Sequence, residues 1–133
     1  MFVVRTKLAP SPIHGIGVFA GEPIQKGQVI WTYDARLELV FSPEELDEFP
    51  PSVRDYYIDH TYSEMRDGRE VFILSSDDSK YMNHSESPNT TSSDDNLSDY
   101  AARPIQEGEE LTCNYFTFDL RAKEKLDHPV SGR

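Results

Sequence analysis

Two segments near opposite ends of the chain align without a gap, and this internal repeat restricts the fold more than any other feature. FAGEPIQKGQVI begins at residue 19 and YAARPIQEGEEL begins at residue 100. Each places a Pro-Ile-Gln-x-Gly turn between two short β-forming stretches, which predicts a strand, a turn and a second strand. A chance match of a common turn is the simpler explanation. A true repeat predicts a compact β fold with pseudo-twofold symmetry.

Short β-type segments make up most of the remaining sequence, and Gly, Pro, Asp and Asn separate them. The segments are FVVRTKL, GVFA, QVIWTY, RLELVF, YYIDHTY, EVFILS, DYAA and ELTCNY. Asp67-Gly68 lies between two β-forming runs and predicts a hairpin turn. The long connections between the two repeat units exclude a simple up-and-down meander, so we expect small separate sheets.

One helix is signalled clearly, in SPEELDEF. Ser42 can cap it, Pro43 suits its first position, and Glu45 completes a capping box. Pro50-Pro51 should end this helix, and a second short helix over 53–57 is possible. The sequence therefore predicts a mainly β fold with a short helical insert.

The 133 residues provide material for a single domain. No apolar run approaches the roughly 18 residues of a membrane span, and the first residues lack the pattern of a signal peptide. Cys113 is the one cysteine, which excludes an internal disulfide and a multi-cysteine zinc site. We therefore expect an intracellular protein that is not bound to a membrane, and the sequence does not distinguish cytoplasm from nucleus.

The net charge of −11 argues against direct binding to nucleic acid, because an acidic surface repels phosphates. The same surface would attract a basic peptide. Solubility alone is the simpler reason for such a charge.

Two motifs imitate known sites and fail on their context. GIGVFA, residues 15–20, fits the dinucleotide-binding glycine pattern, but the glycines and proline that follow forbid the helix that this motif needs. HSESP, residues 84–88, resembles part of a zinc deaminase motif, but the required pair of cysteines is missing. We expect neither a nucleotide fold nor a metal site.

Three segments together resemble the SET domain of protein-lysine methyltransferases. They are HGIGVFAGEPIQKGQVI from residue 14, YMNHSESPN from residue 81 and GEELTCNY from residue 108. The second is distinctive, and the order and spacing of all three fit the family. The resemblance implies a β-clip-like fold of small sheets, in which the third segment crosses beneath a loop in a knot-like way to meet the second. It covers a single domain over 1–120, followed by a C-terminal tail over 121–133.

The resemblance also implies the site residues. Tyr115 matches the catalytic tyrosine, and Tyr33 lies where the family often has a second channel tyrosine, although a core tyrosine fits equally well. The implied contacts to S-adenosylmethionine come from the glycine turn and from the second motif, namely His14, Gly15, Ile16, Gly17, Asn83 and the His84 backbone, with Tyr115 beside them. The ring of His84 is expected to bond to the crossing segment, and Asn89 to support the loop.

The function that follows from the resemblance is transfer of a methyl group from S-adenosylmethionine to a lysine of a basic protein, possibly histone or histone-like. Acidic residues near the implied site, Glu86, Asp94, Asp95 and Asp99, could attract such a substrate. The cysteine-rich segment that follows many SET domains has no counterpart here, so FTFDL (116–120) or a second subunit, in a homodimer, must close the site. A non-catalytic module that binds a basic peptide or a small ligand is the alternative.

Overall fold

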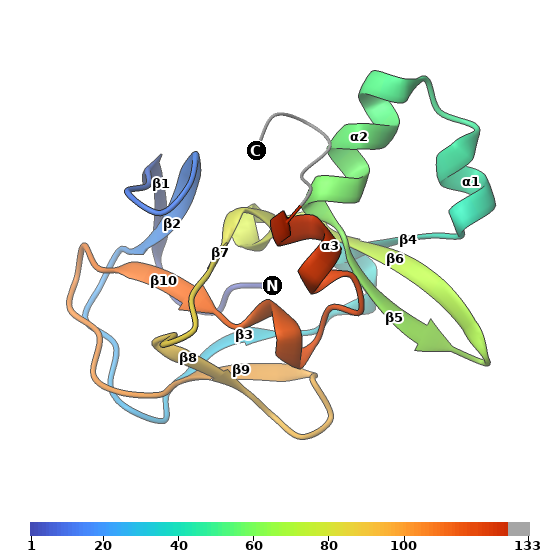
Figure 1. Cartoon of the computed structure of the whole chain (residues 1–133). Coiled ribbons are helices and arrows are strands. Elements are labelled where there is room, and N and C mark those ends of the chain that lie inside the picture. The colour runs from blue at the N-terminus through green and yellow to red at the C-terminus, as the bar shows by residue number, and fades with distance from the viewer. Residues whose placement is uncertain (128–133) are drawn as a thin grey trace.

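The computed structural model describes residues 1–127, and these form small sheets with short helices between them (Figure 1). A four-stranded sheet has the order β1-β2-β10-β7. Its strands are β1 (Thr6–Pro10), β2 (Ile16–Ala20), β10 (Glu110–Cys113) and β7 (Asn83–His84). The β10–β7 pair is parallel and its other pairs are antiparallel. This sheet brings the second and third of the SET-like motifs side by side.

Two three-stranded antiparallel sheets complete the β structure. One contains β3 (Val29–Thr32), β9 (Ser98–Ala101) and β8 (Thr90–Ser92), and the other contains β4 (Glu38–Phe41), β6 (Arg69–Ser75) and β5 (Tyr62–Arg66). The α-helices are α1 (Pro43–Asp47), α2 (Pro51–His60) and α3 (Ala122–Asp127). Short 3₁₀ turns lie at η1 (Ala35–Leu37), η2 (Asp78–Tyr81) and η3 (Tyr115–Thr117). The prediction of a mainly β fold with a helical insert is confirmed.

The two copies of the sequence repeat pair with each other. Ile24 and Ile105 exchange both main-chain hydrogen bonds, at 2.9 and 2.8 Å. The surrounding bonds are equivalent: Ala20 N–H donates to the carbonyl of Glu109, and Ala101 N–H, 81 positions later, donates to that of Gln28. Each unit bonds in the same way to its counterpart, so the predicted pseudo-twofold symmetry is confirmed and the chance match is rejected.

Two local predictions are also confirmed. Asp67 and Gly68 both have positive φ, 50° and 76°, as a two-residue hairpin turn between β5 and β6 requires. Ser42 accepts from the Glu45 N–H at 3.1 Å, and the Glu45 carboxylate accepts from the Ser42 N–H at 3.3 Å, which completes the capping box of α1.

The strand predicted over YYIDHTY is wrong. Residues 56–60 form the second half of α2, and only Tyr62 belongs to a strand. α1 already ends at Asp47, and Pro51 begins α2, where a proline is favourable because the first N–H of a helix has no partner. Aromatic side chains of this segment then pack from the surface of the helix, and the Tyr57 ring stacks on that of Phe49 at 5.5 Å between ring centroids. Tertiary packing thus overrides their β propensity.

The core contains side chains from the four-stranded sheet and from the β3–β9–β8 sheet, and it includes both repeat units. Val18, Ile30 and Leu111 are fully buried there. Ala122 at the start of α3 is 1% exposed and belongs to the same cluster. Arg121 to Asp127, assigned from sequence to the tail, therefore pack on the domain, whereas residues 128–133 of that tail lie outside the described part. Over 1–127, no helix is long and apolar enough to cross a membrane.

Candidate active site

Tyr115 lies at the centre of the candidate site, directly after β10. The chain leaves the sheet at Asn114, whose side chain caps the short turn η3 by accepting from the Phe116 N–H at 3.0 Å. This turn directs Tyr115 inward, where it is 8% exposed. Its hydroxyl donates to the main-chain carbonyl of Met82 at 2.5 Å. The Met82 carbonyl and the Tyr115 hydroxyl therefore place two oxygen atoms side by side.

Two cavities meet at this pair of residues. The larger has a volume of about 470 Å³ and the smaller about 320 Å³. Both are lined by Tyr115 and Met82, and also by three further residues, Asp59, His60 and Lys80. A group bound in one cavity can therefore approach a group bound in the other across Tyr115.

The smaller cavity brings together most of the residues expected to contact a cofactor. His14, Gly15, Ile16 and Asn83 line it with Tyr115. Gly15 has a φ of 46°, which lets the turn pass close to the cavity wall. Gly17 and His84 belong to neighbouring positions but are not part of this lining.

Asn83 holds the glycine turn in place. Its side-chain amide donates to the carbonyl of His14 at 2.9 Å and to Oε2 of Glu110 at 3.0 Å. The same carboxylate accepts from the Ser11 hydroxyl at 2.7 and 2.9 Å. Glu110 is therefore a site residue that the sequence reasoning missed, although it stands inside the motif GEELTCNY.

Gly17 has a packing role in this network. A Cβ at this position would lie 2.6 Å from Oε2 of Glu110. That distance is too short for a carbon and an oxygen that are not bonded. Glycine allows β2 to approach the partly buried Glu110 carboxylate this closely without displacing it.

The His84 ring bonds to the crossing segment, as predicted. Its Nδ1 accepts from the main-chain N–H of Tyr115 at 3.1 Å, so the neutral ring carries its proton on Nε2. The ring also contacts Tyr115 and Phe116, at 5.3 and 5.5 Å between centroids. His84 thus fixes the start of η3 from behind and supports Tyr115.

Asn89 supports the loop that links the motifs, which also confirms a prediction. Its Oδ1 accepts from the Thr112 N–H at 2.9 Å, and its amide donates to the Glu110 carbonyl at 2.8 Å. These bonds take the place of a missing strand partner along one side of β10.

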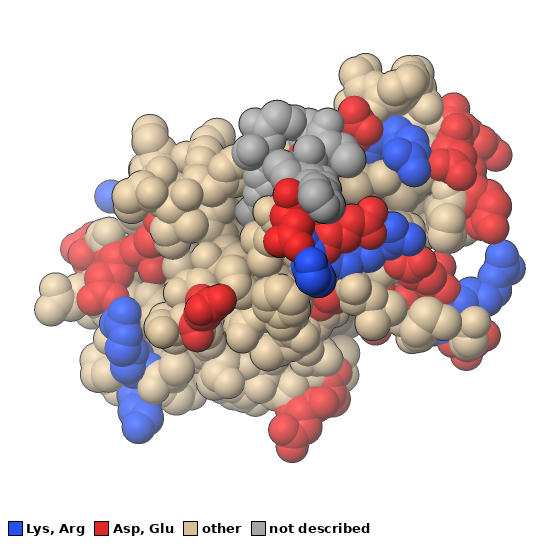
Figure 2. Space-filling model, viewed as in Figure 1, with Lys and Arg blue, Asp and Glu red and all other residues tan. Residues whose placement is uncertain are grey.

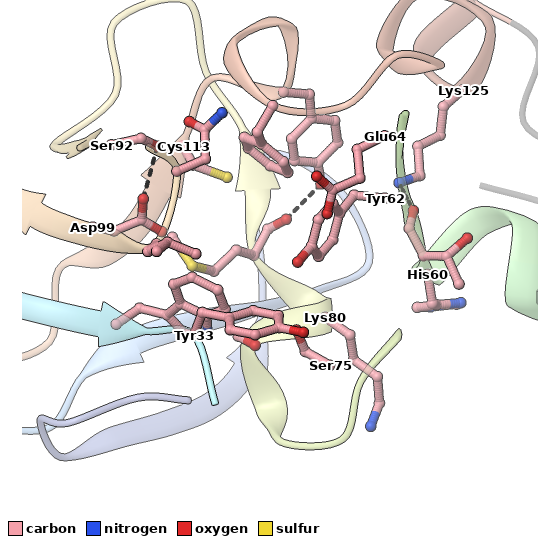
Figure 3. Close-up of a pocket in the computed structure, with 18 of the residues that line it drawn as sticks. Tyr33, His60, Tyr62, Glu64, Ser75, Lys80, Ser92, Asp99, Cys113 and Lys125 are labelled. Atoms are coloured by element: carbon pink, nitrogen blue, oxygen red, sulfur yellow. Dashed lines mark hydrogen bonds between the residues drawn. The ribbon is translucent and has the colours of Figure 1, made fainter. Parts of the chain in front are cut away.

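Tyr33 lies in the wall of the larger cavity and is partly exposed, so it is not a core tyrosine. The guanidinium of Arg66 lies 5.8 Å from the centre of its ring and pairs with Glu64 at 2.9 Å. Figure 3 shows Asp99 and Ser92 at one end of this cavity and His60 and Lys125 at the other. The cavity is therefore an elongated hollow between the β8–β9 hairpin and the end of α2.

Two side chains of the larger cavity's wall, Tyr62 and Cys113, are held in their neutral forms. Burial raises the pKa of the Tyr62 hydroxyl, with neighbouring carboxylates adding to the effect. Burial also raises the pKa of the Cys113 thiol. Neither group is poised to act as an anionic nucleophile or base.

Carboxylates from one hairpin face the larger cavity. Asp95 and Asp99 line it, whereas Glu86 and Asp94, also expected near the site, are exposed and lie outside its lining. Burial raises the pKa of Asp99, against the effect of its 2.7 Å bond from the Ser92 hydroxyl. Acidic side chains also cover more of the visible face than basic ones (Figure 2).

The end of α2 contributes residues that the sequence did not place at the site. Asp59 and His60 line both cavities. The His60 ring stacks on Tyr56 at 4.2 Å and meets Tyr81 edge-on at 5.6 Å. The sequence prediction of a strand over this segment did not place Asp59 and His60 at the site, because an extended strand would carry them to a different position than the helix does.

The comparison with protein families decides the relationship. The family described as SET domain matches residues 15–116. The chain belongs to the SET domain family. This SET chain therefore has the fold that the three sequence motifs implied. A search of curated protein sequences found no match.

Solved structures show the same SET fold at low sequence identity. A Plasmodium falciparum protein assigned as a histone methyltransferase is 22% identical, with a TM-score of 0.57 over 84% of this chain and 93% of that one. The Neurospora histone lysine methyltransferase DIM-5 is 19% identical, with a TM-score of 0.57 over 86% of this chain and 53% of its own. Polycomb Repressive Complex 2 of Chaetomium thermophilum, in an autoinhibited conformation with S-adenosylmethionine, is 20% identical, with a TM-score of 0.65 over 93% of this chain and 16% of that one.

Proposed function

We propose that this SET protein transfers a methyl group from S-adenosylmethionine to a lysine side chain of a basic protein, of the histone or histone-like kind. The observation that carries the proposal is that two cavities share Tyr115 and Met82 in their walls, and that the hydroxyl of the first is hydrogen-bonded to the carbonyl of the second. A donor in one cavity and an acceptor in the other would face each other there. Such positioning can contribute several kcal/mol to lowering a barrier, on the order of 7–11 for well-aligned groups.

The smaller cavity fits the cofactor. Its volume of about 320 Å³ is within the range of small-molecule sites. The turn at His14 and Gly15 offers backbone groups, and Asp59 and Lys80 offer charges of both signs for a zwitterionic amino-acid end. Bound S-adenosylmethionine would supply an activated methyl group on a sulfonium. Related structures in the family include one solved with this compound.

The larger cavity would receive the target lysine. Its amine has an ordinary pKa of about 10.4 and must lose a proton before it can attack a methyl group. Burial against Tyr115 and Cys113 favours the neutral amine, and the proton can leave to water before the cavity is filled. The Tyr115 hydroxyl would then orient the amine, with weak C–H···O contacts from its oxygen and the Met82 carbonyl to the methyl group.

Two carboxylates at one end of the larger cavity support a basic protein as the substrate. Asp95 and Asp99 would meet cationic residues beside the target lysine. Two of the related structures are described as histone methyltransferases, which agrees with a lysine-rich substrate for this chain.

The test is transfer of labelled methyl groups from S-adenosylmethionine to a mixture of basic proteins, comparing wild type with Tyr115→Phe. We expect the variant to bind cofactor in calorimetry but to transfer about 100-fold less, a change on the order of 2.7 kcal/mol. Tyr57→Phe is the matched control, because Tyr57 stacks on Phe49 outside both cavities.

Each outcome separates the enzyme from its alternative. Equal transfer by wild type and Tyr115→Phe would remove Tyr115 from the mechanism. Binding of a basic peptide with no transfer by wild type would favour a non-catalytic module. If wild type did not bind S-adenosylmethionine, the proposed function would be wrong.

A further inference from the structure

Lys125 is a buried cation close to the candidate catalytic tyrosine. It belongs to α3, and its side chain is 9% exposed. Its ammonium lies 5.2 Å from the centre of the Tyr115 ring. It donates to Oδ2 of Asp119 at 3.0 Å and to the main-chain carbonyl of Thr61 at 2.5 Å. A lysine with two such acceptors is held in one place.

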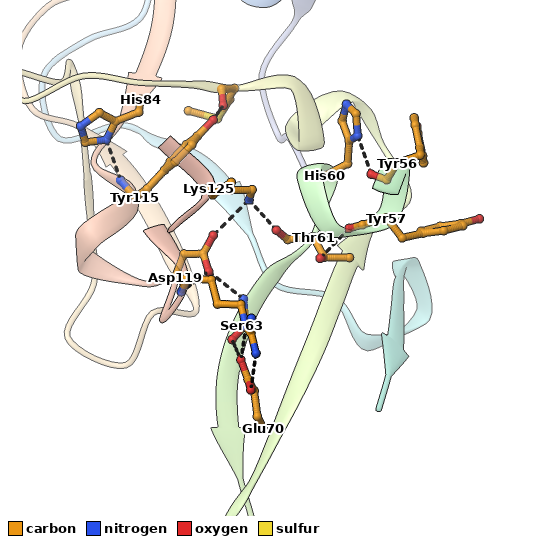
Figure 4. Close-up of polar contacts among 12 residues, drawn as sticks. Tyr56, Tyr57, His60, Thr61, Ser63, Glu70, His84, Tyr115, Asp119 and Lys125 are labelled. Atoms are coloured by element: carbon orange, nitrogen blue, oxygen red, sulfur yellow. Dashed lines mark hydrogen bonds and ion pairs between the residues drawn. The ribbon is translucent and has the colours of Figure 1, made fainter. Parts of the chain in front are cut away.

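Asp119 connects this cation to the rest of the site. Its side chain is 2% exposed, and its Oδ1 accepts from the N–H groups of Ser63 at 3.1 Å and Arg121 at 3.0 Å. The two carboxylate oxygens therefore join the start of β5 to the start of α3. Figure 4 shows Lys125 between Asp119 and Thr61, with Tyr115 on the other side.

The position of this pair matters because Lys125 lines the larger cavity and is not part of the smaller cavity's lining. Through Thr61, the ammonium ties α3 to the end of α2, which forms the wall shared by both cavities. Through Asp119, it ties α3 to the segment that follows η3. The turn η3 itself begins with Tyr115. Removing the ammonium would release both connections at once.

We propose that Lys125 is a positioning residue for methyl transfer: its ammonium fastens α3 across the acceptor cavity and fixes the face of Tyr115. This role rests on the proposed function, since it concerns the acceptor side of the same reaction. The ion pair also leaves little net charge at this wall, so the buried cation does not repel an incoming lysine. In this way α3 contributes one side chain, Lys125, to the wall of the acceptor cavity.

The experiment compares Lys125→Met with Lys123→Met on the same helix. Methionine keeps most of the length of the lysine side chain but removes the ammonium. Lys123 is 82% exposed and pairs with Asp127, so its variant controls for loss of a charge from α3. Lys125→Arg retains the charge, and the double variant Lys125→Met/Asp119→Asn avoids leaving a buried carboxylate unpaired.

Three measurements test these variants: cofactor affinity by calorimetry, kcat and acceptor KM by methyl transfer, and hydrogen exchange of the α3 amides by mass spectrometry. For Lys125→Met and the double variant we expect a loss of about 10- to 100-fold in kcat, because small displacements of reacting groups are costly. Cofactor affinity should stay within about twofold of wild type, and the α3 amides should exchange at least roughly tenfold faster. Lys125→Arg should recover part of kcat, and Lys123→Met should match wild type.

Several results would overturn the proposal. They are equal kcat for Lys125→Met and Lys123→Met, no recovery by Lys125→Arg, or unchanged exchange of α3. Methylation of Lys125 itself would also do so, since it would show that the ammonium leaves Asp119. Hydrogen exchange of α3 can be measured without enzymatic activity. If wild type transferred no methyl group, the proposed function would be refuted, but the exchange data would still test whether Lys125 holds α3 in place.

Discussion

The main-chain N–H of Tyr115 donates to Nδ1 of His84, a residue 31 positions earlier in the chain. This bond joins the second and third of the three motifs that carry the resemblance to the SET family. It also gives the histidine beside the candidate site a structural role, because the acceptor nitrogen of its ring is used for the backbone. The His84 ring orients Tyr115 by accepting a hydrogen bond from the main-chain N–H of that tyrosine.

Replacing His84 by Phe tests this bond. Phenylalanine retains the ring contacts with Tyr115 and Phe116 but leaves the Tyr115 N–H without its acceptor. We expect the free energy of unfolding to fall by about 1–3 kcal/mol, the cost of a partly buried donor without a partner. Urea denaturation measures it, and an unchanged midpoint would show that water replaces the bond at no cost.

Replacing Gly17 by Ala tests the contact with Glu110. The new Cβ would displace the carboxylate that holds Ser11 and Asn83, and overpacking of this kind costs about 1–3 kcal/mol. In a Glu110→Ala background the same substitution should cost less, because the 2.6 Å contact is gone and only Ser11 Cβ, at 3.0 Å, stays close. A double-mutant cycle by denaturation gives this coupling, and additive losses would contradict the assignment.

The repeat predicts equal behaviour at two distant glycines. Gly27 and Gly108 occupy equivalent turns, with φ of 82° and 89°, and a Cβ would meet no atom within 4 Å at either. Gly27→Ala and Gly108→Ala should therefore each lower the free energy of unfolding by about 1–2 kcal/mol, through backbone strain alone. Clearly unequal losses in denaturation would show that the twofold symmetry does not extend to energetics.

The charged carboxylate of partly buried Asp99 should lower the free energy of unfolding. Burial raises its pKa in the folded protein, so the cost of its charge is present at neutral pH and disappears as the pH falls below the ordinary value of 3.8. Asp99→Asn should therefore unfold at a higher temperature than wild type at pH 7, and the difference should vanish near pH 3.8. Thermal unfolding across pH measures it. A constant difference would exclude ionisation as the cause.

The same variant should bind a basic acceptor less well. We expect acceptor KM to rise several-fold in Asp99→Asn, and wild-type KM to rise with salt as the attraction is screened. Asp94→Asn is the control, because Asp94 lies on the same hairpin but is exposed and outside the cavity lining. A wild-type KM that does not change with salt would refute the attraction.

The sequence by itself determined features that depend on neighbouring residues or on a repeated pattern. Asp67-Gly68 formed its hairpin and Ser42 its capping box because short-range sterics and hydrogen bonds decide both. The repeat and the three motifs indicated the pseudo-twofold fold and the SET family before any contact was known.

Only the tertiary structure decided which residues meet. Residues 56–60 became helix because packing outweighed their β propensity, and this brought Asp59 and His60 to the site. Glu110 accepts a hydrogen bond from Asn83, 27 positions earlier in the chain, and Lys125 donates one to Thr61, 64 positions earlier. No local pattern records such contacts, because burial and pairing of a charge depend on the whole fold.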